Sequence, residues 1–212
     1  MTDITIIGSG NMARAIGTRA VAAGRSVQIL NRTPENAAKL AAELGGTTSS
    51  GGLSEVPEGD IVFLALYFGP AKEVATHFGD TLSGKTVVDF CNPIDTETFD
   101  SLVVAPGTSA AEEIAALLPG ARVVKAFNTT FAGPLGSSAA GGQPMDVFIA
   151  SDSEEARNEV AVFAEAAGLR PLQVGGLRHA RELEGFQLLV MALQANPAYP
   201  TFNWGTGLKI TD

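Results

Sequence analysis

The residues of this chain that could do chemistry begin with a glycine turn close to the N-terminus. The apolar run Ile4–Gly8 ends in the pattern Gly-x-Gly-x-x-Ala, with Gly8, Gly10 and Ala13 at its fixed positions. Gly8 permits a tight turn, Gly10 lets the backbone come close to an anion, and the small Ala13 lets the following helix pack against the strand. The free N–H groups at the start of that helix face the anion. The motif therefore predicts a site for the pyrophosphate of a dinucleotide.

The sequence around the turn supports this interpretation, which a glycine pattern alone would not. A helix-compatible stretch, Asn11–Ala23, follows the turn, and Gly24 is placed to end that helix. Ser26–Leu30 then supplies the second strand of a βαβ unit. An ordinary glycine-rich turn in some other α/β protein is the alternative interpretation.

The tripeptide Asn31-Arg32-Thr33 at the end of the second strand is the next chemical signal. It lies about 20 residues beyond the glycine turn, where NAD-binding proteins place an acid that binds the ribose hydroxyls. Here no carboxylate repels a 2′-phosphate, and the planar guanidinium of Arg32 can pair with phosphate and stack on adenine. Asn31 and Thr33 can add hydrogen bonds. The sequence therefore predicts NADP(H) as the cofactor, with a solvated strand-end arginine as the alternative.

The chain offers little acid–base machinery. His77 and His179 are interpreted as surface or capping residues, and Cys91, with no histidine motif nearby, as a half-buried thiol. No spacing of histidines and cysteines indicates a metal site, and Ser9 lies in a phosphate-type turn rather than a nucleophile elbow. This pattern fits a reaction in which a hydride passes directly between two stacked rings, so that the protein has only to position them.

Strand and helix patterns alternate along the chain, which indicates an α/β fold with a doubly wound parallel sheet. Strands are expected at Ile4–Gly8, Ser26–Leu30, Ile61–Leu66, Thr86–Asp89, Arg122–Phe127, Met145–Ala150 and Arg170–Val174. Helices are expected at Asn11–Ala23, Pro34–Leu44, Pro70–Phe78, Ala110–Leu118, Glu154–Ala167 and Arg181–Gln194. Two long loops, Asn92–Ser109 and Thr129–Pro144, follow strands at their carboxyl ends, where such sheets bind ligands.

Composition favours one domain, because 212 residues, 45% of them hydrophobic, fill one α/β core but not two full-sized ones. The net charge of −9 argues against nucleic acid and anionic membranes as partners, so an anionic ligand must be met by local geometry. No secretory signal is expected before the first strand, and the apolar stretch Phe186–Ala195 is too short to span a membrane. A single cysteine excludes an internal disulfide, and a cytoplasmic location is expected.

Several segments together resemble the NADP-dependent oxidoreductases of coenzyme F420. They are Gly8–Ala13, Asn31–Thr33, Lys125–Thr129, the strand Gly168–Leu172 with Gly175–Leu177 after it, and the ending Gly207–Ile210. The glycine motif alone also fits pyrroline-5-carboxylate reductase. That enzyme has an extra helical domain, for which a chain of 212 residues has no room.

The resemblance implies a single Rossmann-type domain that transfers a hydride reversibly between NADP(H) and the deazaflavin coenzyme F420 as co-substrate. Residues 1–150 would form the dinucleotide-binding core, and residues 151–212 a C-terminal αβα extension that completes the acceptor crevice. The implied cofactor contacts are Gly8, Ser9, Gly10, Asn11, Met12, Asn31, Arg32, Thr33, Leu66, Tyr67 and Asn92. The implied acceptor contacts are Asn128, Thr129, Thr130, Phe131, Ala132 and Leu208, and no side chain is expected to act as a catalytic acid or base.

The acceptor remains open between alternatives. Members of the family carry histidine, threonine, isoleucine and proline where this chain has Asn128–Phe131, and Phe131 fits either a deazaflavin contact or a core aromatic. An anionic deazaflavin tail would require cations, for which the candidates are Arg122, Lys125, Arg178, Arg181 and Lys209. A flavin or ferric-chelate reductase is the alternative enzyme, because some metalloreductase domains share the glycine turn and the Lys125–Thr129 segment. A NADPH-binding protein without turnover is the alternative outside enzymes.

A homodimer is expected from the resemblance and from the apolar C-terminal helix. Phe186, Leu189, Val190 and Leu193 recur at helical spacing, which fits either a face against a second copy or burial within the same chain. The segment Asn196–Asp212 is too aromatic for a solvated tail and is expected to fold back over the domain or over a partner chain.

Overall fold

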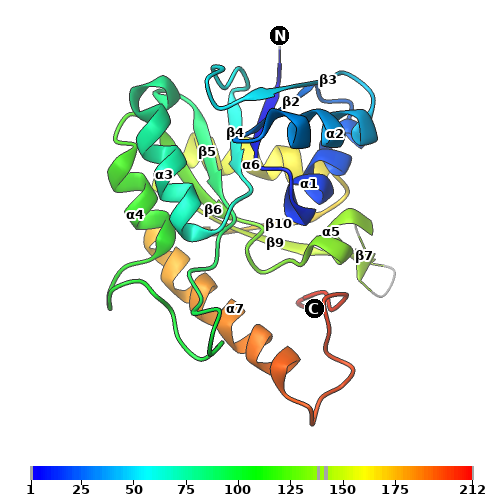
Figure 1. Ribbon diagram of the computed structural model, residues 1–212. Coiled ribbons are helices and arrows are strands. Elements are labelled where there is room, and N and C mark those ends of the chain that lie inside the picture. Colours follow the sequence, from blue (N-terminus) through cyan, green and yellow to red (C-terminus); the bar gives the residue numbers. More distant parts are fainter. Residues whose placement is uncertain (1, 138, 141–142, 212) are drawn as a thin grey trace.

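One mixed sheet of eight strands, in the order β10-β9-β6-β5-β4-β1-β2-β3, forms the centre of the molecule (Figure 1). The structure is a computed structural model that describes residues 2–137, 139–140 and 143–211. The strands of the sheet are β1 (Ile4–Ile7), β2 (Val27–Asn31), β3 (Thr48–Gly52), β4 (Ile61–Leu64), β5 (Thr86–Asp89), β6 (Arg122–Ala126), β9 (Asp146–Ala150) and β10 (Arg170–Gly175). The helices are α1 (Asn11–Ala22), α2 (Pro34–Leu44), α3 (Phe68–Phe78), α4 (Ala110–Leu117), α5 (Ala132–Ser137), α6 (Glu154–Ala166) and α7 (Ala180–Ala195).

The direction of the last two strands corrects the expected all-parallel sheet. Strands β1 to β6 run parallel, but β9 pairs antiparallel with β6, and β10 is parallel to β9. A parallel neighbour of β6 would require a crossover to the opposite edge of the sheet. Instead the chain stays at the carboxyl edge, where it forms α5 and the small pair β7 (Ala139–Ala140) and β8 (Gln143–Pro144), and β9 starts from there.

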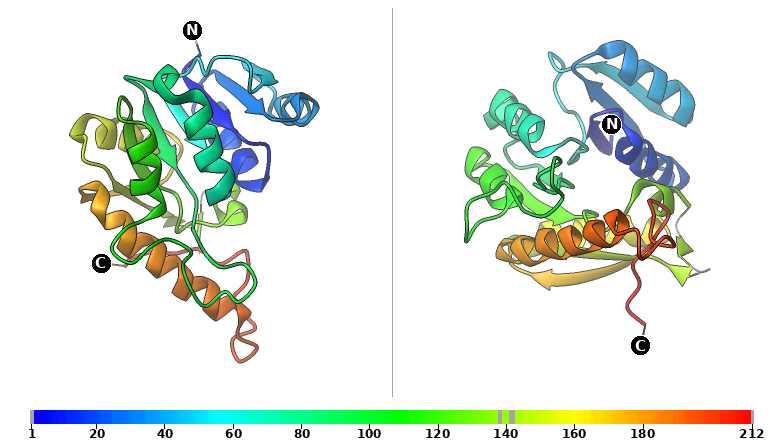
Figure 2. Two further views of the ribbon diagram at one scale, coloured as in Figure 1. Left: turned by 60° about the vertical axis from the view of Figure 1, so that its left-hand side comes forward. Right: turned by 60° about the horizontal axis from the view of Figure 1, so that its bottom comes forward.

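Helices cover both faces of the sheet, which confirms the doubly wound α/β fold (Figure 2). Helices α1, α2 and α6 contribute Ile16, Leu40 and Phe163 to the core on one face. Helices α3 and α4 contribute Val74 and Ile114 to the core on the other face. The chain moves outward from β1 to β2 and β3, and then crosses to β4, so the sheet reverses its winding between β1 and β4. Ligands bind in the crevice outside such a reversal.

Strand β3 and helix α5 were absent from the sequence prediction. Strand β3 contains only threonine, serine and glycine, so it has no apolar residue to signal an edge strand. Helix α5 begins at Ala132, inside the segment Thr129–Pro144 that was expected to be a loop. Arg19 of α1 donates hydrogen bonds to the carbonyl groups of Leu135 and Gly136 at the end of α5, so α5 is stabilised by a contact distant in sequence. Residues 138, 141 and 142 of that predicted loop lie outside the described residues.

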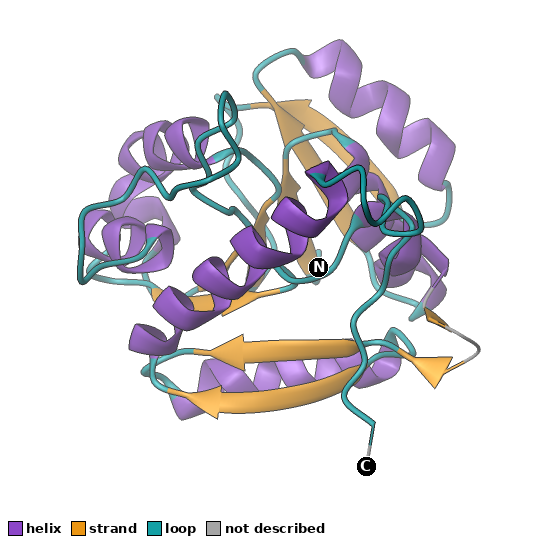
Figure 3. Ribbon diagram, turned by 90° about the horizontal axis from the view of Figure 1, so that it is seen from below, coloured by secondary structure: helices purple, strands orange, loops and turns teal. Residues whose placement is uncertain are grey.

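Helix α7 runs diagonally across the carboxyl ends of β5 and β6, and in the view from below it lies beside β9 and β10 (Figure 3). Leu183, Glu184 and Gln187 are buried, whereas the side chains of Phe186 and Leu189 are 39% and 65% exposed. The apolar face of α7 is therefore only partly buried within this chain. The homodimer remains a prediction.

No helix in the described part of the chain is long and apolar enough to cross a membrane.

A buried lysine ties this helix to the sheet. The Nζ of Lys125, at the end of β6, lies 2.7 Å from Oδ2 of Asp89 on β5 and 2.7 Å from Oε1 of Glu184 on α7, and all three side chains have no exposure. Glu184 also accepts hydrogen bonds from the N–H groups of Ala110 and Ala111, so it caps the start of α4. One ion cluster thus connects two strands and two helices.

The protonation of this cluster follows from burial and pairing. Burial by itself would lower the pKa of Lys125, but Asp89, and after it Cys91 and Glu184, hold that pKa above its ordinary value. Burial raises the pKa of Glu184, and Lys125 opposes that rise. The lysine therefore stays charged, and removal of its ammonium would leave two carboxyl groups buried without a cation.

We predict that Lys125→Met lowers the free energy of unfolding by about 3–5 kcal/mol, because it leaves uncompensated buried charge. Urea unfolding followed by circular dichroism measures this loss. Arg122→Met is the matched control on the same strand, since Arg122 pairs with Glu155 and Glu159 at a partly exposed position and should cost about 1 kcal/mol or less. Equal losses in the two variants would contradict the special role of Lys125.

Candidate functional site

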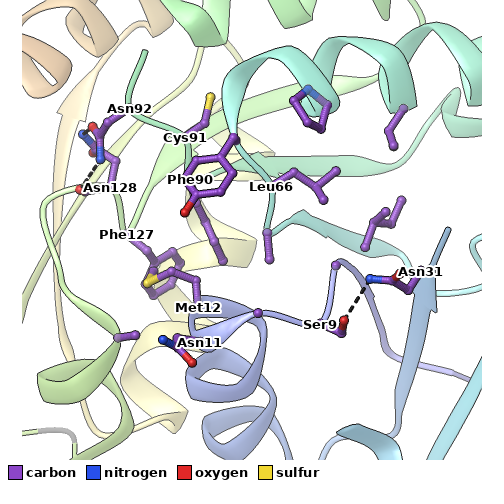
Figure 4. A pocket seen from close by; sticks show the side chains of 18 of the residues that line it. Ser9, Asn11, Met12, Asn31, Leu66, Phe90, Cys91, Asn92, Phe127 and Asn128 are labelled. Carbon is purple, nitrogen blue, oxygen red and sulfur yellow. Dashed lines mark hydrogen bonds between the residues drawn. The ribbon is translucent and has the colours of Figure 1, made fainter. Parts of the chain in front are cut away.

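A cavity of about 830 Å³ lies at the carboxyl edge of the sheet, where the winding reverses (Figure 4). Its size is within the range of small-molecule sites, about 300–1,000 Å³. The residues predicted to contact the cofactor all line it, namely Gly8, Ser9, Gly10, Asn11, Met12, Asn31, Arg32, Thr33, Leu66, Tyr67 and Asn92. Of the predicted acceptor contacts, Asn128, Thr130, Phe131 and Ala132 line the cavity, whereas Thr129 and Leu208 do not.

The glycine turn combines a close approach with an open side. Gly8 has φ +123°, and a Cβ on it would lie 2.4 Å from the carbonyl oxygen of Ala65, which follows β4. A Cβ on Gly10 would meet no atom within 4 Å. No side chain caps the start of α1, so the first N–H groups of the helix are left to a ligand. The turn therefore suits an anion placed against Gly10 and the start of α1.

The end of β2 supplies the polar side chains next to this turn. The Nδ2 of Asn31 donates a hydrogen bond of 2.9 Å to Oγ of Ser9 (Figure 4), and the Oδ1 of Asn31 accepts one of 2.8 Å from the N–H of Thr33. Arg32 is exposed at the cavity and forms no ion pair or hydrogen bond with another described residue. Its guanidinium is thus available to a phosphate.

The strand ends on the other side of the cavity are joined by two asparagines. The Nδ2 of Asn92 donates to the carbonyl oxygen of Asn128, and the Nδ2 of Asn128 donates to Oδ1 of Asn92, each at 2.9 Å (Figure 4). The Nδ2 of Asn128 also donates to the carbonyl oxygen of Leu183 on α7. The two asparagines therefore link the ends of β5 and β6 to the helix that crosses them.

Phe127, directly after β6, adopts a left-handed backbone conformation with φ +62°. This region is unfavourable for a bulky residue and persists only where the surroundings hold it. The ring of Phe127 is fully buried and lies 5.6 Å from that of Phe90 and 6.0 Å from that of Phe63. Core packing thus imposes the turn that leads the chain from β6 along the cavity.

The far end of the cavity is aromatic. Phe131 is 8% exposed and meets the 64% exposed Trp204 edge to face, with ring centroids 5.3 Å apart. Both residues line the cavity, so Phe131 is a buried aromatic that also faces the cavity, and its contact with an acceptor stays a prediction. Trp204 belongs to the C-terminal segment. Its contact with Phe131 shows that this segment folds back over the domain, which was one of the two arrangements expected from the sequence.

Asp146 at the start of β9 anchors this segment. Its carboxylate accepts hydrogen bonds from the side chains of Arg170 and Lys209 and from the N–H of Ile210. Burial alone would raise the pKa of Asp146, but these three donors outweigh it and lower the pKa to about 2. The anchor therefore stays ionised at neutral pH and holds the tail beside the cavity.

Several lining residues were not identified from the sequence. His77 lies at the cavity with its Nε2 2.8 Å from the carbonyl oxygen of Leu53. Gln187, Met191 and Trp204 line it from α7 and the tail. No local motif marks them, because their position depends on how α7 crosses the sheet. His179 directly precedes α7, outside the cavity lining, and its side chain makes no capping hydrogen bond.

Cys91 lines the cavity as a buried free thiol. Burial, with the nearby Asp89, raises the pKa of Cys91 well above its ordinary value. The thiol is therefore protonated and unreactive near neutral pH. Within the described ranges, no group of three or more His, Cys, Asp or Glu side chains is arranged to hold a metal ion.

The cations expected to bind an anionic acceptor tail lie elsewhere. None of the five lines the cavity, and each is paired with acids of this chain. Lys125 is fully buried in its cluster, Arg181 pairs with Glu112, and Lys209 pairs with Asp146. The lining of the cavity therefore does not contain the expected cations, and a contact between them and an acceptor tail outside the cavity stays a prediction.

Comparisons with known proteins agree with this geometry. Residues 3–93 match the protein-family model described as NADP oxidoreductase coenzyme F420-dependent. Metalloreductase STEAP3 of Rattus norvegicus is 34% identical over 188 residues, which cover 89% of this chain and 37% of the rat protein. The chain thus spans less than two fifths of the length of that relative.

Two solved structures share the fold over most of their length. The hypothetical protein SMa0349 from Sinorhizobium meliloti is 30% identical with a TM-score of 0.76, and the match covers 84% of this chain and 86% of that one. A proposed F420-dependent NADP-reductase from Arthrobacter sp. FB24 is 24% identical with a TM-score of 0.82, over 96% of this chain and 97% of that one. The second likeness concerns the fold alone.

The two glycines of the turn should respond differently to substitution by alanine. Gly10→Ala should leave the melting temperature within about 1 °C, since its Cβ meets open space and its φ of −78° suits any residue, but should weaken NADP⁺ binding at least about tenfold, because the methyl group occupies the anion site. Gly8→Ala should lower both stability and binding. Differential scanning fluorimetry and calorimetric titration measure these effects. Unchanged NADP⁺ affinity in Gly10→Ala would contradict the assigned anion site.

Proposed function

We propose that this chain, of which residues 3–93 match the family model described as NADP oxidoreductase coenzyme F420-dependent, catalyses reversible hydride transfer between NADP(H) and the deazaflavin ring of coenzyme F420. The observation that carries the proposal is a single cavity that joins the glycine turn and Arg32 to an aromatic end. Hydride transfer between two stacked rings demands positioning above all, and the cavity offers room for both at one strand edge.

The cofactor half of the cavity fits a phosphorylated dinucleotide. The start of α1 and the open side of Gly10 receive the pyrophosphate, and the unpaired guanidinium of Arg32 receives the 2′-phosphate. Asn31 is held between Ser9 and Thr33, so it presents no carboxylate to that phosphate. When bound, NADPH supplies the hydride.

The acceptor half fits a flat, mostly apolar ring system. Thr130, Phe131, Met191 and Trp204 line it, and none of these side chains titrates. The titratable groups of the lining are Arg32, Tyr67, Glu73, His77 and Cys91. The thiol of Cys91 is protonated and buried, so this half of the site is built to exclude water and orient a ring rather than to move a proton.

The second candidate activity is the NADPH-dependent reduction of a flavin or of a ferric chelate. The 34% identity to the rat metalloreductase favours this candidate. The five cations predicted to bind the F420 tail favour this candidate as well. Each of them is paired with an acid of this chain, so recognition of the acceptor falls to its ring. A NADPH-binding protein without turnover is the remaining alternative. The homodimer and the cytoplasmic location stay predictions.

The acceptor assay tests the proposal. Purified protein is mixed with NADPH and oxidised F420, and loss of the deazaflavin absorption is followed, with NADH, riboflavin phosphate and ferric citrate in parallel. We expect bleaching of F420 with NADPH and at least about tenfold slower bleaching with NADH. We also expect tail-free deazariboflavin to react within about threefold of F420, because the ring carries recognition.

Two other outcomes would contradict F420 as the acceptor. Reduction of riboflavin phosphate or ferric citrate without reduction of F420 would replace the proposed activity by the second candidate. Tight NADPH binding with no acceptor reduced would leave a binding protein and contradict an enzymatic role.

Arg32→Ala should discriminate the two nicotinamide cofactors. Loss of a charge-assisted pair with the 2′-phosphate should weaken NADPH binding about 10–100-fold and change NADH binding by less than about threefold. Fluorescence titration of the two cofactors measures both constants. Arg14→Ala, at an exposed arginine that pairs with Glu43 outside the cavity lining, is the control and should change neither. Equal weakening of both cofactors by Arg32→Ala would exclude Arg32 as the discriminator.

A further inference from the structure

Gln187 is a buried amide without a partner inside the cavity. The residue is 1% exposed, lies on α7 and lines the cavity. Its Oε1 atom is buried and accepts no hydrogen bond within the described residues, and no described residue pairs with its Nε2. Buried amides in folded proteins are almost always paired. An unpaired one that faces a cavity points to a ligand.

Asn128 adds a second unpaired acceptor next to it. The Nδ2 of Asn128 donates to Oδ1 of Asn92 and to the carbonyl oxygen of Leu183, which fixes the orientation of the amide. Its Oδ1 atom is buried and has no partner within the described part of the chain. Leu183 precedes Gln187 by one helical turn, so both residues lie on the same side of α7. The two orphan oxygens therefore belong to one region of the acceptor half.

A third unpaired amide oxygen, on α7, lies outside the cavity lining. The Oε1 of Gln194 is also buried without a partner, but the Nε2 of Gln194 donates to the carbonyl oxygen of Asn203 in the tail. Gln194 does not line the cavity. The ligand argument therefore applies to Gln187 and Asn128 and not to every glutamine of α7.

We propose that Gln187, together with Oδ1 of Asn128, recognises the amide-like edge of a bound ring, in which an N–H group stands beside a carbonyl group. A glutamine amide can donate to the carbonyl and accept from the N–H, and the Asn128 oxygen can accept from the same N–H of a pyrimidine edge or from the second N–H of a carboxamide. This inference rests on the proposed function and makes Gln187 a specificity-determining residue of it. Two ligand groups have this chemistry: the pyrimidine edge of a flavin-type ring and the carboxamide of nicotinamide.

The test uses Gln187→Met, which keeps the length of the side chain and removes both hydrogen-bonding groups. Gln173→Met is the control, because Gln173 is an exposed residue on β10 outside the cavity lining. Binding is read from the single tryptophan, Trp204, whose ring lines the cavity. The probes are riboflavin, NADP⁺ and the 3-acetylpyridine analogue of NADP⁺, which lacks the carboxamide N–H groups. Melting temperatures are measured without ligand.

We expect Gln187→Met to raise the melting temperature by about 2–4 °C, since it removes an unpaired buried amide. We also expect the substitution to weaken the binding of one probe about tenfold. Weaker riboflavin binding assigns the residue to the pyrimidine edge. Weaker NADP⁺ binding with an unchanged 3-acetylpyridine analogue assigns it to the carboxamide. Gln173→Met should leave the dissociation constants of all three probes unchanged.

Unchanged affinity for riboflavin and for NADP⁺ would overturn the inference. A lowered melting temperature together with equal weakening of all three probes would overturn it as well, because it would indicate a structural role. The readouts are binding and stability rather than turnover, so a failure of F420 reduction in the wild-type protein contradicts the proposed activity without altering this test.

Discussion

The buried ammonium of Lys125 is the interaction on which the arrangement of the cavity depends. Its partners are Asp89 at the end of β5 and Glu184 on α7, and Glu184 also caps the start of α4. Charges without exposure must be neutralised inside the fold, so these four elements cannot shift independently without a large cost. The helix that carries Gln187 is thereby held across the carboxyl edge of the sheet, and an open strand edge becomes an enclosed site.

Two strand ends with positive φ shape the two halves of this site. Gly8 has a positive φ and approaches Ala65 so closely that no side chain fits. Phe127 has a positive φ although it is bulky, and the aromatic core around it maintains that conformation. The first position follows local chemistry, because only glycine is tolerated there. At the second, packing outweighs the local preference of the residue.

The family model covers the cofactor half of the site only, whereas the relatives reported above match most of the chain. The family match covers residues 3–93, which contain the glycine turn, the Asn31–Thr33 segment and the end of β5. The aromatic end, Gln187 and Trp204 lie outside that range. In an acidic chain, the cofactor half meets its anion with backbone N–H groups and one unpaired arginine, while other cations near the site are neutralised in pairs. The acceptor half relies on ring contacts and amide groups.

Local signals in the sequence predict both the doubly wound fold, which the structure confirms, and the cofactor half of the site. Gly8–Ala13 and Asn31–Thr33 are short motifs on consecutive elements, and their geometry follows from the βαβ unit. No local pattern predicts that β9 and β10 run opposite to the other strands, that Lys125 is buried, or that Gln187 and Trp204 reach the cavity. These features depend on contacts between segments far apart in the chain, where burial and charge pairing outweigh any local preference.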